Sequence, residues 1–142
     1  HPPHGSRGYA PITSAAAAGL GPDGPRPLLA FQIETTDALR EVGAIAQLPA
    51  ADVVFVGPYD LAIALGTVPD PADPALAGAV QRVVDAASGA AVLGAYVRAA
   101  AETPAWAQRG FGLLCVGFDG AVFRDGMARL REEVAAAMEG AP

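Results

Sequence analysis

The chain has 142 residues, 52% of them hydrophobic and 17% charged, a composition that suits one folded domain and is unlike that of disordered chains. Nine Lys and Arg against 15 Asp and Glu give a formal net charge of −6, so no basic field favours nucleic acid or an anionic membrane surface as a partner. Its apolar runs are far shorter than the roughly 20 residues that cross a bilayer, and its one cysteine, Cys115, excludes an internal disulfide framework, so the expected location is the cytoplasm.

The first 27 residues are crowded with Pro and Gly, which disfavour regular structure. We therefore expect an arm or loop over residues 1–27 and a single domain over residues 28–142. Because the sequence begins at His1 rather than Met, we expect a processed product or a piece of a longer chain. We expect His1 and His4 to be loop or tag residues rather than a general base.

Beyond residue 27, short apolar runs alternate with longer segments that have helical spacing. The runs are apolar almost throughout, which is typical of strands covered on both faces in a parallel sheet. Cys115 lies in the last run and is expected to be a small buried hydrophobe. The predicted strands are residues 28–34, 52–57, 91–97 and 112–117, and the predicted helices are residues 36–47, 73–88, 99–109 and 121–138.

Four βα units of this size suit two architectures. One is a small open α/β sheet, and the other is half of an eight-stranded barrel, which normally takes about 250 residues. Periodicity leaves this choice open. Half a barrel would expose two apolar strand edges, which native proteins cover or close, so a half needs a partner.

Two carboxylates are distinguished by their positions in the predicted sheet. Glu34 ends the first apolar run and Asp60 follows the second. Neighbouring parallel strands end at the same edge of a sheet, so the two side chains are expected to converge there and to suit a hard divalent cation. In the alternative interpretation, Glu34 stabilises the first turn of the following helix and Asp60 caps a short turn over residues 61–65.

The residues beside these carboxylates point to a second feature of the same edge. Gly57 allows close backbone approach and Pro58 stiffens the turn, so the N–H groups of Tyr59 and Asp60 would face an anionic carboxylate at a helix start. A plain strand-to-helix turn is the alternative. Gln32 lies on the same side of its strand as Glu34, so its amide is expected to face the same site. In the alternative interpretation, Gln32 is buried and its amide satisfies backbone groups.

Several motifs together resemble a known family. FQIETTDALREVGAIAQLPAADVVFVGPYDLAIALG, residues 31–66, resembles the signature stretch of the HpcH/HpaI family of metal-dependent class II pyruvate aldolases, which includes 4-hydroxy-2-oxoheptanedioate aldolase and 2-dehydro-3-deoxyglucarate aldolase. VLGAYV is similar to that family's seventh strand, and LLCVGFDGAVFR is similar to its eighth strand and closing turn. PPHGSRG resembles the loop before its fifth strand.

The resemblance implies the C-terminal half of a (β/α)8 TIM barrel of the phosphoenolpyruvate/pyruvate type. It implies aldol cleavage of 4-hydroxy-2-oxo acids to pyruvate and an aldehyde, and the reverse condensation. Glu34 and Asp60 would ligate Mg²⁺ or Mn²⁺, with Co²⁺ as a further candidate, and the cation would act as a Lewis acid. The implied substrate-binding residues are Gln32, Gly57, Pro58, Tyr59 and Tyr96.

The chain departs from the family pattern at its start, because the family's strands one to four have no counterpart here. The family's catalytic histidine and its substrate-binding arginine therefore have no match, and the catalytic residues stay unassigned. We expect a homo-oligomer or association with an N-terminal half-barrel. The alternatives are a non-catalytic remnant or interaction module of the same fold, and a carbon–carbon lyase like the citrate lyase β-subunit or malyl-CoA lyase; the VGPYDL motif favours the aldolases over these lyases.

Overall fold

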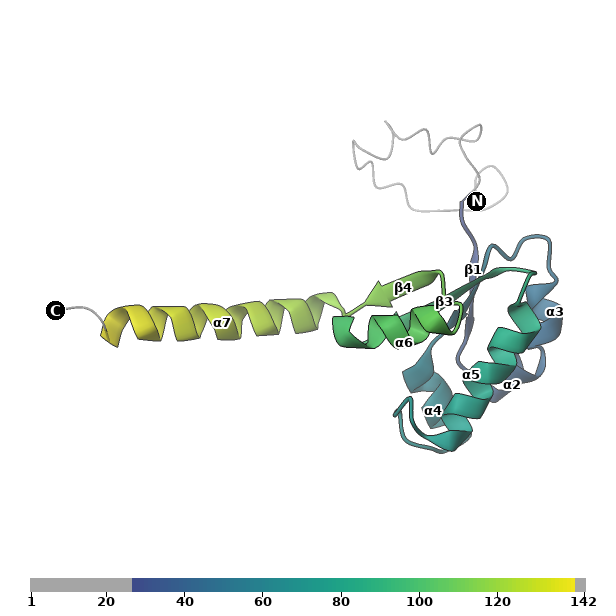
Figure 1. The fold of residues 1–142 in the computed structure, drawn as a ribbon, viewed down its shortest axis with the longest axis horizontal. Helices are drawn as coiled ribbons and strands as arrows, with labels where there is room; N and C mark the ends of the chain where they lie inside the picture. The colour runs from purple at the N-terminus through teal and green to yellow at the C-terminus, as the bar shows by residue number, and fades with distance from the viewer. Residues whose placement is uncertain (1–26, 140–142) are drawn as a thin grey trace, which may run out of the picture.

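The computed structural model describes residues 27–139 and contains one parallel sheet of four strands. The strands lie side by side in chain order, so each predicted strand pairs with the next one along the chain (Figure 1). The arm predicted over residues 1–27 falls, apart from its last residue, outside the described residues. The strands are β1 (Ala30–Ile33), β2 (Val53–Val56), β3 (Val92–Val97) and β4 (Leu113–Val116).

The helices follow the predicted alternation with three differences, one of which is that the helix predicted over residues 99–109 is a short 3-10 helix followed by an α-helix. The segment predicted as one helix over residues 36–47 is broken at Glu41, which ends one short helix and begins the next. An additional helix begins directly after β2, at Pro58. The helices are α2 (Thr36–Arg40), α3 (Val42–Ala46), α4 (Pro58–Leu65), α5 (Pro74–Ala87), η1 (Ala100–Glu102), α6 (Thr103–Gln108) and α7 (Asp119–Glu139).

The hydrophobic core lies between one face of the sheet and the helices α2 to α6. Ile33, Val56 and Val97, which occupy this face of β1, β2 and β3, are almost completely inaccessible to solvent. Leu61 of α4 and Val83 of α5 are equally buried and belong to the same cluster. This single core positions the carboxyl ends of the strands and the start of α4 relative to one another.

The other face of the sheet is open in the part of the chain that the structure describes. Side chains alternate between the two faces of a strand, and Val92 and Leu113, which point away from the helices, are 51% and 36% exposed. Cys115 is also exposed, so the prediction that it is buried is wrong. The prediction that both faces are covered is likewise not met within residues 27–139, because the described helices pack on one face only.

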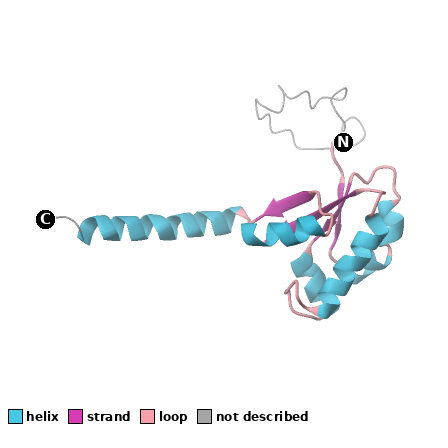
Figure 2. Cartoon of the chain, in the orientation of Figure 1, coloured by secondary structure: helices cyan, strands magenta, loops and turns pink. Residues whose placement is uncertain are grey.

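Helix α7 projects from the compact body as a 21-residue extension (Figure 2). None of its residues is buried, although it carries apolar side chains at helical spacing. Within the described residues, no helix is both long enough and apolar enough to cross a membrane. The exposed large apolar side chains of α7 are Val122, Phe123, Met127, Leu130, Val134 and Met138.

Helix α5 begins at the predicted signal, with Asp73 as its N-cap and Pro74 in its first turn. Asp73 Oδ1 accepts hydrogen bonds of 3.0 Å from the backbone N–H groups of Ala75 and Leu76. The N–H of Leu76, followed by the hydroxyl of Thr67, holds the pKa of Asp73 below its ordinary value of 3.8. A lowered folded-state pKa means that the stabilisation is complete above pH 3.8 and is lost as the pH falls through the folded-state pKa.

We therefore expect Asp73→Ala to lower the midpoint of thermal unfolding by a few degrees at pH 7, because two backbone donors lose their acceptor. The difference from the unmodified chain should shrink as the pH falls below the ordinary carboxyl pKa. Asp73→Asn, which keeps a capping oxygen without a titrating group, should remain close to the unmodified chain at pH 7. Thermal melts followed by circular dichroism check this, and a difference that persists undiminished at low pH would contradict it.

Candidate active site

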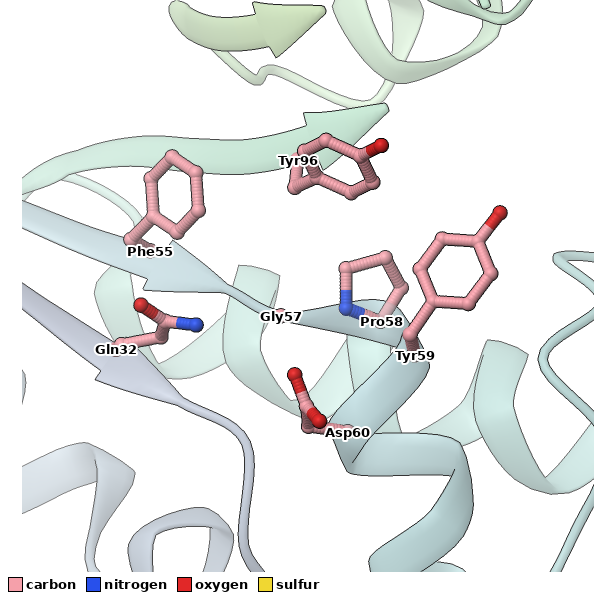
Figure 3. Close-up of a pocket in the computed structure, with 7 residues that line it drawn as sticks. All are labelled: Gln32, Phe55, Gly57, Pro58, Tyr59, Asp60 and Tyr96. Carbon is pink, nitrogen blue, oxygen red and sulfur yellow. The ribbon is translucent and has the colours of Figure 1, made fainter. Parts of the chain in front are cut away.

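A pocket of about 260 Å³ opens at the carboxyl edge of the sheet (Figure 3). Its lining comes from β1, β2, the start of α4 and β3, so all of these segments contribute to a single site. The five residues predicted to bind substrate and one of the two predicted metal ligands are among the residues that line it. The lining residues are Gln32, Phe55, Gly57, Pro58, Tyr59, Asp60 and Tyr96.

Glu34, the other predicted metal ligand, lies directly after β1 and is half-buried. Its Oε2 accepts a hydrogen bond of 2.5 Å from Nε2 of Gln32, so the two side chains lie on the same side of the strand, as predicted. Gln32 is exposed, which rules out the alternative of a buried glutamine that satisfies backbone groups. The N-cap of α2 is Thr35, whose hydroxyl accepts from Ala38 N, so Glu34 is not the capping side chain.

Gly57 is the point at which β1 and the start of α4 come together. A Cβ placed on Gly57 would lie 2.9 Å from Gln32 Nε2, 3.3 Å from Glu34 Cβ and 3.4 Å from Glu34 Oε2. The backbone N–H of Gly57 also donates to the carbonyl of Ile33, the last residue of β1. Glycine is required here for space, because its φ of −97° is open to any residue.

Asp60 lies in the first turn of α4 and is exposed on the pocket. Because α4 begins at Pro58, the alternative in which Asp60 caps a turn over residues 61–65 is wrong. The N-cap position is Gly57, which has no side chain to accept from the first-turn N–H groups. These groups, on Tyr59 and Asp60, carry the positive end of the helix dipole, which favours an anionic group at this edge.

The rest of the pocket is aromatic. The rings of Tyr59 and Tyr96 meet edge to face, with centroids 5.8 Å apart and planes inclined by 64°. Phe55 completes the lining and is a residue that the sequence reasoning missed. It is the register partner of Gln32, and residues paired across parallel strands share a face, so correct strand pairing would have identified it.

Most of the chain matches one known protein family. The model of the HpcH/HpaI aldolase/citrate lyase family matches residues 9–126. The chain belongs to this family. The resemblance that the Q-I-E and V-G-P-Y-D-L motifs predicted is therefore confirmed.

Individual members of the HpcH/HpaI family agree with this assignment. The chain is 32% identical over 131 residues to a hydroxypyruvate/pyruvate aldolase of Chromohalobacter salexigens, covering 87% of this chain and 52% of that enzyme. It is 31% identical over 138 residues to a 5-keto-4-deoxy-D-glucarate aldolase of Escherichia fergusonii, covering 93% of this chain and 54% of that enzyme. The crystal structure of a family protein from Burkholderia cenocepacia superimposes with a TM-score of 0.72 at 30% identity, covering 94% of this chain and 54% of that one.

The chain thus spans about half the length of the curated relatives that it matches. Its four parallel βα units align with about half of the TIM barrel of HpcH/HpaI structures, as the fold prediction stated. The open face of the sheet is the face that lies inside a closed barrel, where side chains from all strands fill the interior. This face of the sheet is exposed in residues 27–139 because these residues contain about half of the strands of such a barrel.

The residues at the edge fit the divalent cation expected for an HpcH/HpaI protein. The described residues contain no cluster of three or more His, Cys, Asp or Glu side chains able to hold a metal ion. Glu34, which lies against Gly57, and Asp60, in the first turn of α4, instead offer two carboxylates at this edge of the sheet. Two carboxylates, with the remaining positions taken by water and substrate oxygens, are the donors that Mg²⁺ prefers in such sites.

We expect Gly57→Ala to weaken binding of Mn²⁺ about tenfold by displacing Gln32 and Glu34. The fold should change little, because the atom met at the shortest distance, 2.9 Å, is the end of the flexible Gln32 side chain. Gly43→Ala in α3, where a Cβ meets nothing within 4 Å, is the matched control and should bind Mn²⁺ normally. Titration followed by electron paramagnetic resonance of free Mn²⁺ measures both affinities. Equal affinities in the two variants would contradict the close approach at Gly57.

Proposed function

We propose that this chain forms the metal-binding and keto-acid-binding half of a class II pyruvate aldolase. The reaction is cleavage of a 4-hydroxy-2-oxo acid to pyruvate and an aldehyde, together with the reverse condensation. The C3–C4 bond breaks, the 4-hydroxyl group loses its proton as the aldehyde forms, and C3 gains a proton to give pyruvate. Glu34 and Asp60 hold the divalent cation, Mg²⁺ or Mn²⁺ by preference and Co²⁺ as a further candidate.

The observation that carries this proposal is the contact at Gly57. It brings the Gln32–Glu34 pair at the carboxyl end of β1 against the start of α4, which presents Asp60 and the N–H groups of its first turn. Asp60 and the start of α4 line one pocket, and Glu34 adjoins it through its hydrogen bond to Gln32, which is a lining residue. A 2-oxo acid carries the complementary groups, a keto oxygen next to a carboxylate.

Each residue has a defined task in this proposal. Gln32 orients the Glu34 carboxylate through the 2.5 Å hydrogen bond and leaves its other oxygen for the cation. The backbone N–H groups of Tyr59 and Asp60, which Gly57 and Pro58 position at the start of α4, receive the substrate carboxylate. Tyr96 closes the side of the pocket opposite Gln32 (Figure 3). When bound, the divalent cation supplies Lewis-acid stabilisation of the negative charge that develops on the keto oxygen.

Metal-assisted chemistry also agrees with the composition of the chain. All nine of its basic residues are arginines, so these 142 residues contain no lysine. Lysine is the residue that forms Schiff bases with carbonyl substrates in covalent catalysis. No basic side chain lines the pocket either, so we assign the polarisation of the ketone to a cation held by carboxylates, with the dipole of α4 beside it.

We assign no general base within this chain. A second half-barrel, covalently linked or from another chain, would supply the base and close the open face of the sheet. A homo-oligomer is the proposed state of the complete enzyme. The curated relatives described above are a hydroxypyruvate/pyruvate aldolase and a sugar-acid aldolase, which favours the aldolase reaction over the citrate-lyase type.

The test is exchange of the C3 protons of pyruvate with deuterium in D₂O, followed by proton NMR with Mg²⁺ or Mn²⁺. We expect exchange when the chain is co-expressed with the N-terminal half of a family aldolase, and loss of exchange on chelation of the ion. Absence of exchange in that complex, together with absence of ion binding by the chain, would contradict the proposal and favour a non-catalytic remnant of the fold.

A further inference from the structure

We propose that Gly94 is a positioning residue of the cation site, because it lets the Phe55 ring lean away from Gln32 and so leaves room for the Gln32 amide. Gln32 Nε2 donates the 2.5 Å hydrogen bond to Glu34 Oε2 and thereby orients that carboxylate. The inference rests on the proposed function for the role of Glu34 as a ligand of the cation. Gly94 is not among the residues that line the pocket, so it acts through its neighbours.

The first step is the contact between Gly94 of β3 and Phe55 of β2, which are register partners. Gly94 is buried, and a Cβ placed on it would lie 2.6 Å from Phe55 Cδ2 and 3.4 Å from Phe55 Cε2. The Phe55 ring therefore leans from β2 toward β3 and covers the backbone of Gly94. Any side chain at position 94 would take this space, so the ring leans this way because residue 94 is glycine.

The second step concerns Gln32, which lies on the other side of Phe55. Gln32 of β1 is also a register partner of Phe55. Adjacent strands lie about 4.8 Å apart, so a ring that leaned toward β1 would enter the space of Gln32. The Gln32 amide lies over Gly57, where a Cβ would be 2.9 Å from Nε2. Figure 3 shows the Phe55 ring turned toward the strand that carries Tyr96, and the amide nitrogen of Gln32 directed toward Gly57.

The third step combines the two glycine contacts. Gln32 and Phe55 lean in the same direction across the sheet, Gln32 over Gly57 and Phe55 over Gly94. A methyl group on Gly94 would push the Phe55 ring back toward β1, against Gln32, and turn the amide away from Glu34. These contacts lie among β1, β2, β3 and the start of α4, so the argument does not depend on the open face of the sheet.

The test begins with the Gln32 side-chain amide in the complete 142-residue chain without metal. Nitrogen–proton NMR observes this amide, and its loss in Gln32→Ala identifies it. We expect Gly94→Ala to move both Nε2 proton signals of Gln32 toward those of a solvated glutamine amide, because the hydrogen bond to Glu34 is lost. Gly78→Ala in α5, where a Cβ meets nothing within 4 Å, is the matched control and should leave the signals in place. Unchanged signals in Gly94→Ala, the result if the ring rises away from the sheet, would overturn the inference.

The consequence for the cation is measured by electron paramagnetic resonance of free Mn²⁺. Gly94→Ala should weaken Mn²⁺ binding about tenfold. Gly94→Ala combined with Phe55→Ala should return the Gln32 signals, and the affinity to within about twofold of the unmodified chain, because the displaced ring is gone. The new Cβ would still lie 2.8 Å from Val53 Cγ1, so thermal stability should stay lowered. Gln32 signals and affinity that stay altered in the double variant would indicate a general shift of β3 and overturn the role of Phe55.

Phe55→Trp keeps the test decisive if Gly94→Ala does not fold. The larger ring, at a half-buried position, exceeds the space over Gly94 and should move the Gln32 signals in the same direction. Unmoved signals in that variant would count against the inference.

The outcomes separate this inference from the proposed function. Gln32 signals that respond to Gly94→Ala, in a chain that binds no Mn²⁺, would support the positioning and contradict the proposed function. Mn²⁺ binding by the unmodified chain, together with unmoved Gln32 signals in Gly94→Ala, would do the reverse.

Discussion

Glu34→Gln and Asp60→Asn should each weaken Mn²⁺ binding at least about 100-fold, more than substitutions in the surroundings of a metal ligand usually do. Each change removes one of two negative charges while keeping the size of the side chain. Glu34→Gln also keeps an oxygen able to accept the hydrogen bond from Gln32 Nε2. The free energy of unfolding should change little, because neither side chain is part of the buried core. Titration followed by electron paramagnetic resonance of free Mn²⁺ measures the loss.

The control for charge is Asp85→Asn. Asp85 lies near the end of α5, is exposed, and accepts a hydrogen bond from Gln81. The substitution removes the same charge at the end of α5 that precedes β3, away from the carboxyl ends of the strands. Asp85→Asn should bind Mn²⁺ as the unmodified chain does; similar losses in all three variants would indicate a general effect of net charge and contradict the assignment of Glu34 and Asp60.

Leu61→Ala should lower the free energy of unfolding by about 2 to 5 kcal/mol, through lost apolar burial and the cavity left behind. Leu61 is completely buried in the core beneath the start of α4. Ile63, two residues further along the same helix, is 73% exposed, so Ile63→Ala should stay within about 0.5 kcal/mol of the unmodified chain. Urea unfolding followed by circular dichroism gives both values. Comparable losses in the two variants would mean that α4 is not anchored by Leu61.

The strand order was predictable because it depends on local patterns. Each apolar run is short, each is followed by a helical segment, and consecutive parallel strands usually pair. The break at Glu41 was not predictable, because residues 36–47 carry no proline and their helical spacing continues through the break. The exposure of Cys115 was missed for a different reason: an apolar strand predicts a covering layer, but the pattern does not say whether that layer lies within the same 142 residues.

The features of the site that depend only on residue spacing and on the order of the strands were predictable. Gln32 and Glu34 share a face because they are two residues apart, and Asp60 lies at the same edge because it follows the neighbouring strand. Phe55 and Gly94 depend on the register between β1, β2 and β3, which no local pattern fixes. The steric role of Gly57 likewise becomes visible only when β1 is placed beside α4.

The most direct test of the account is the position of a bound ion. Crystals of the chain grown with Mn²⁺ should give an anomalous peak within coordination distance of a carboxylate oxygen of both Glu34 and Asp60. A strong peak that contacts only one of these side chains, or that lies elsewhere on the molecule, would contradict the shared metal site on which the proposed function depends.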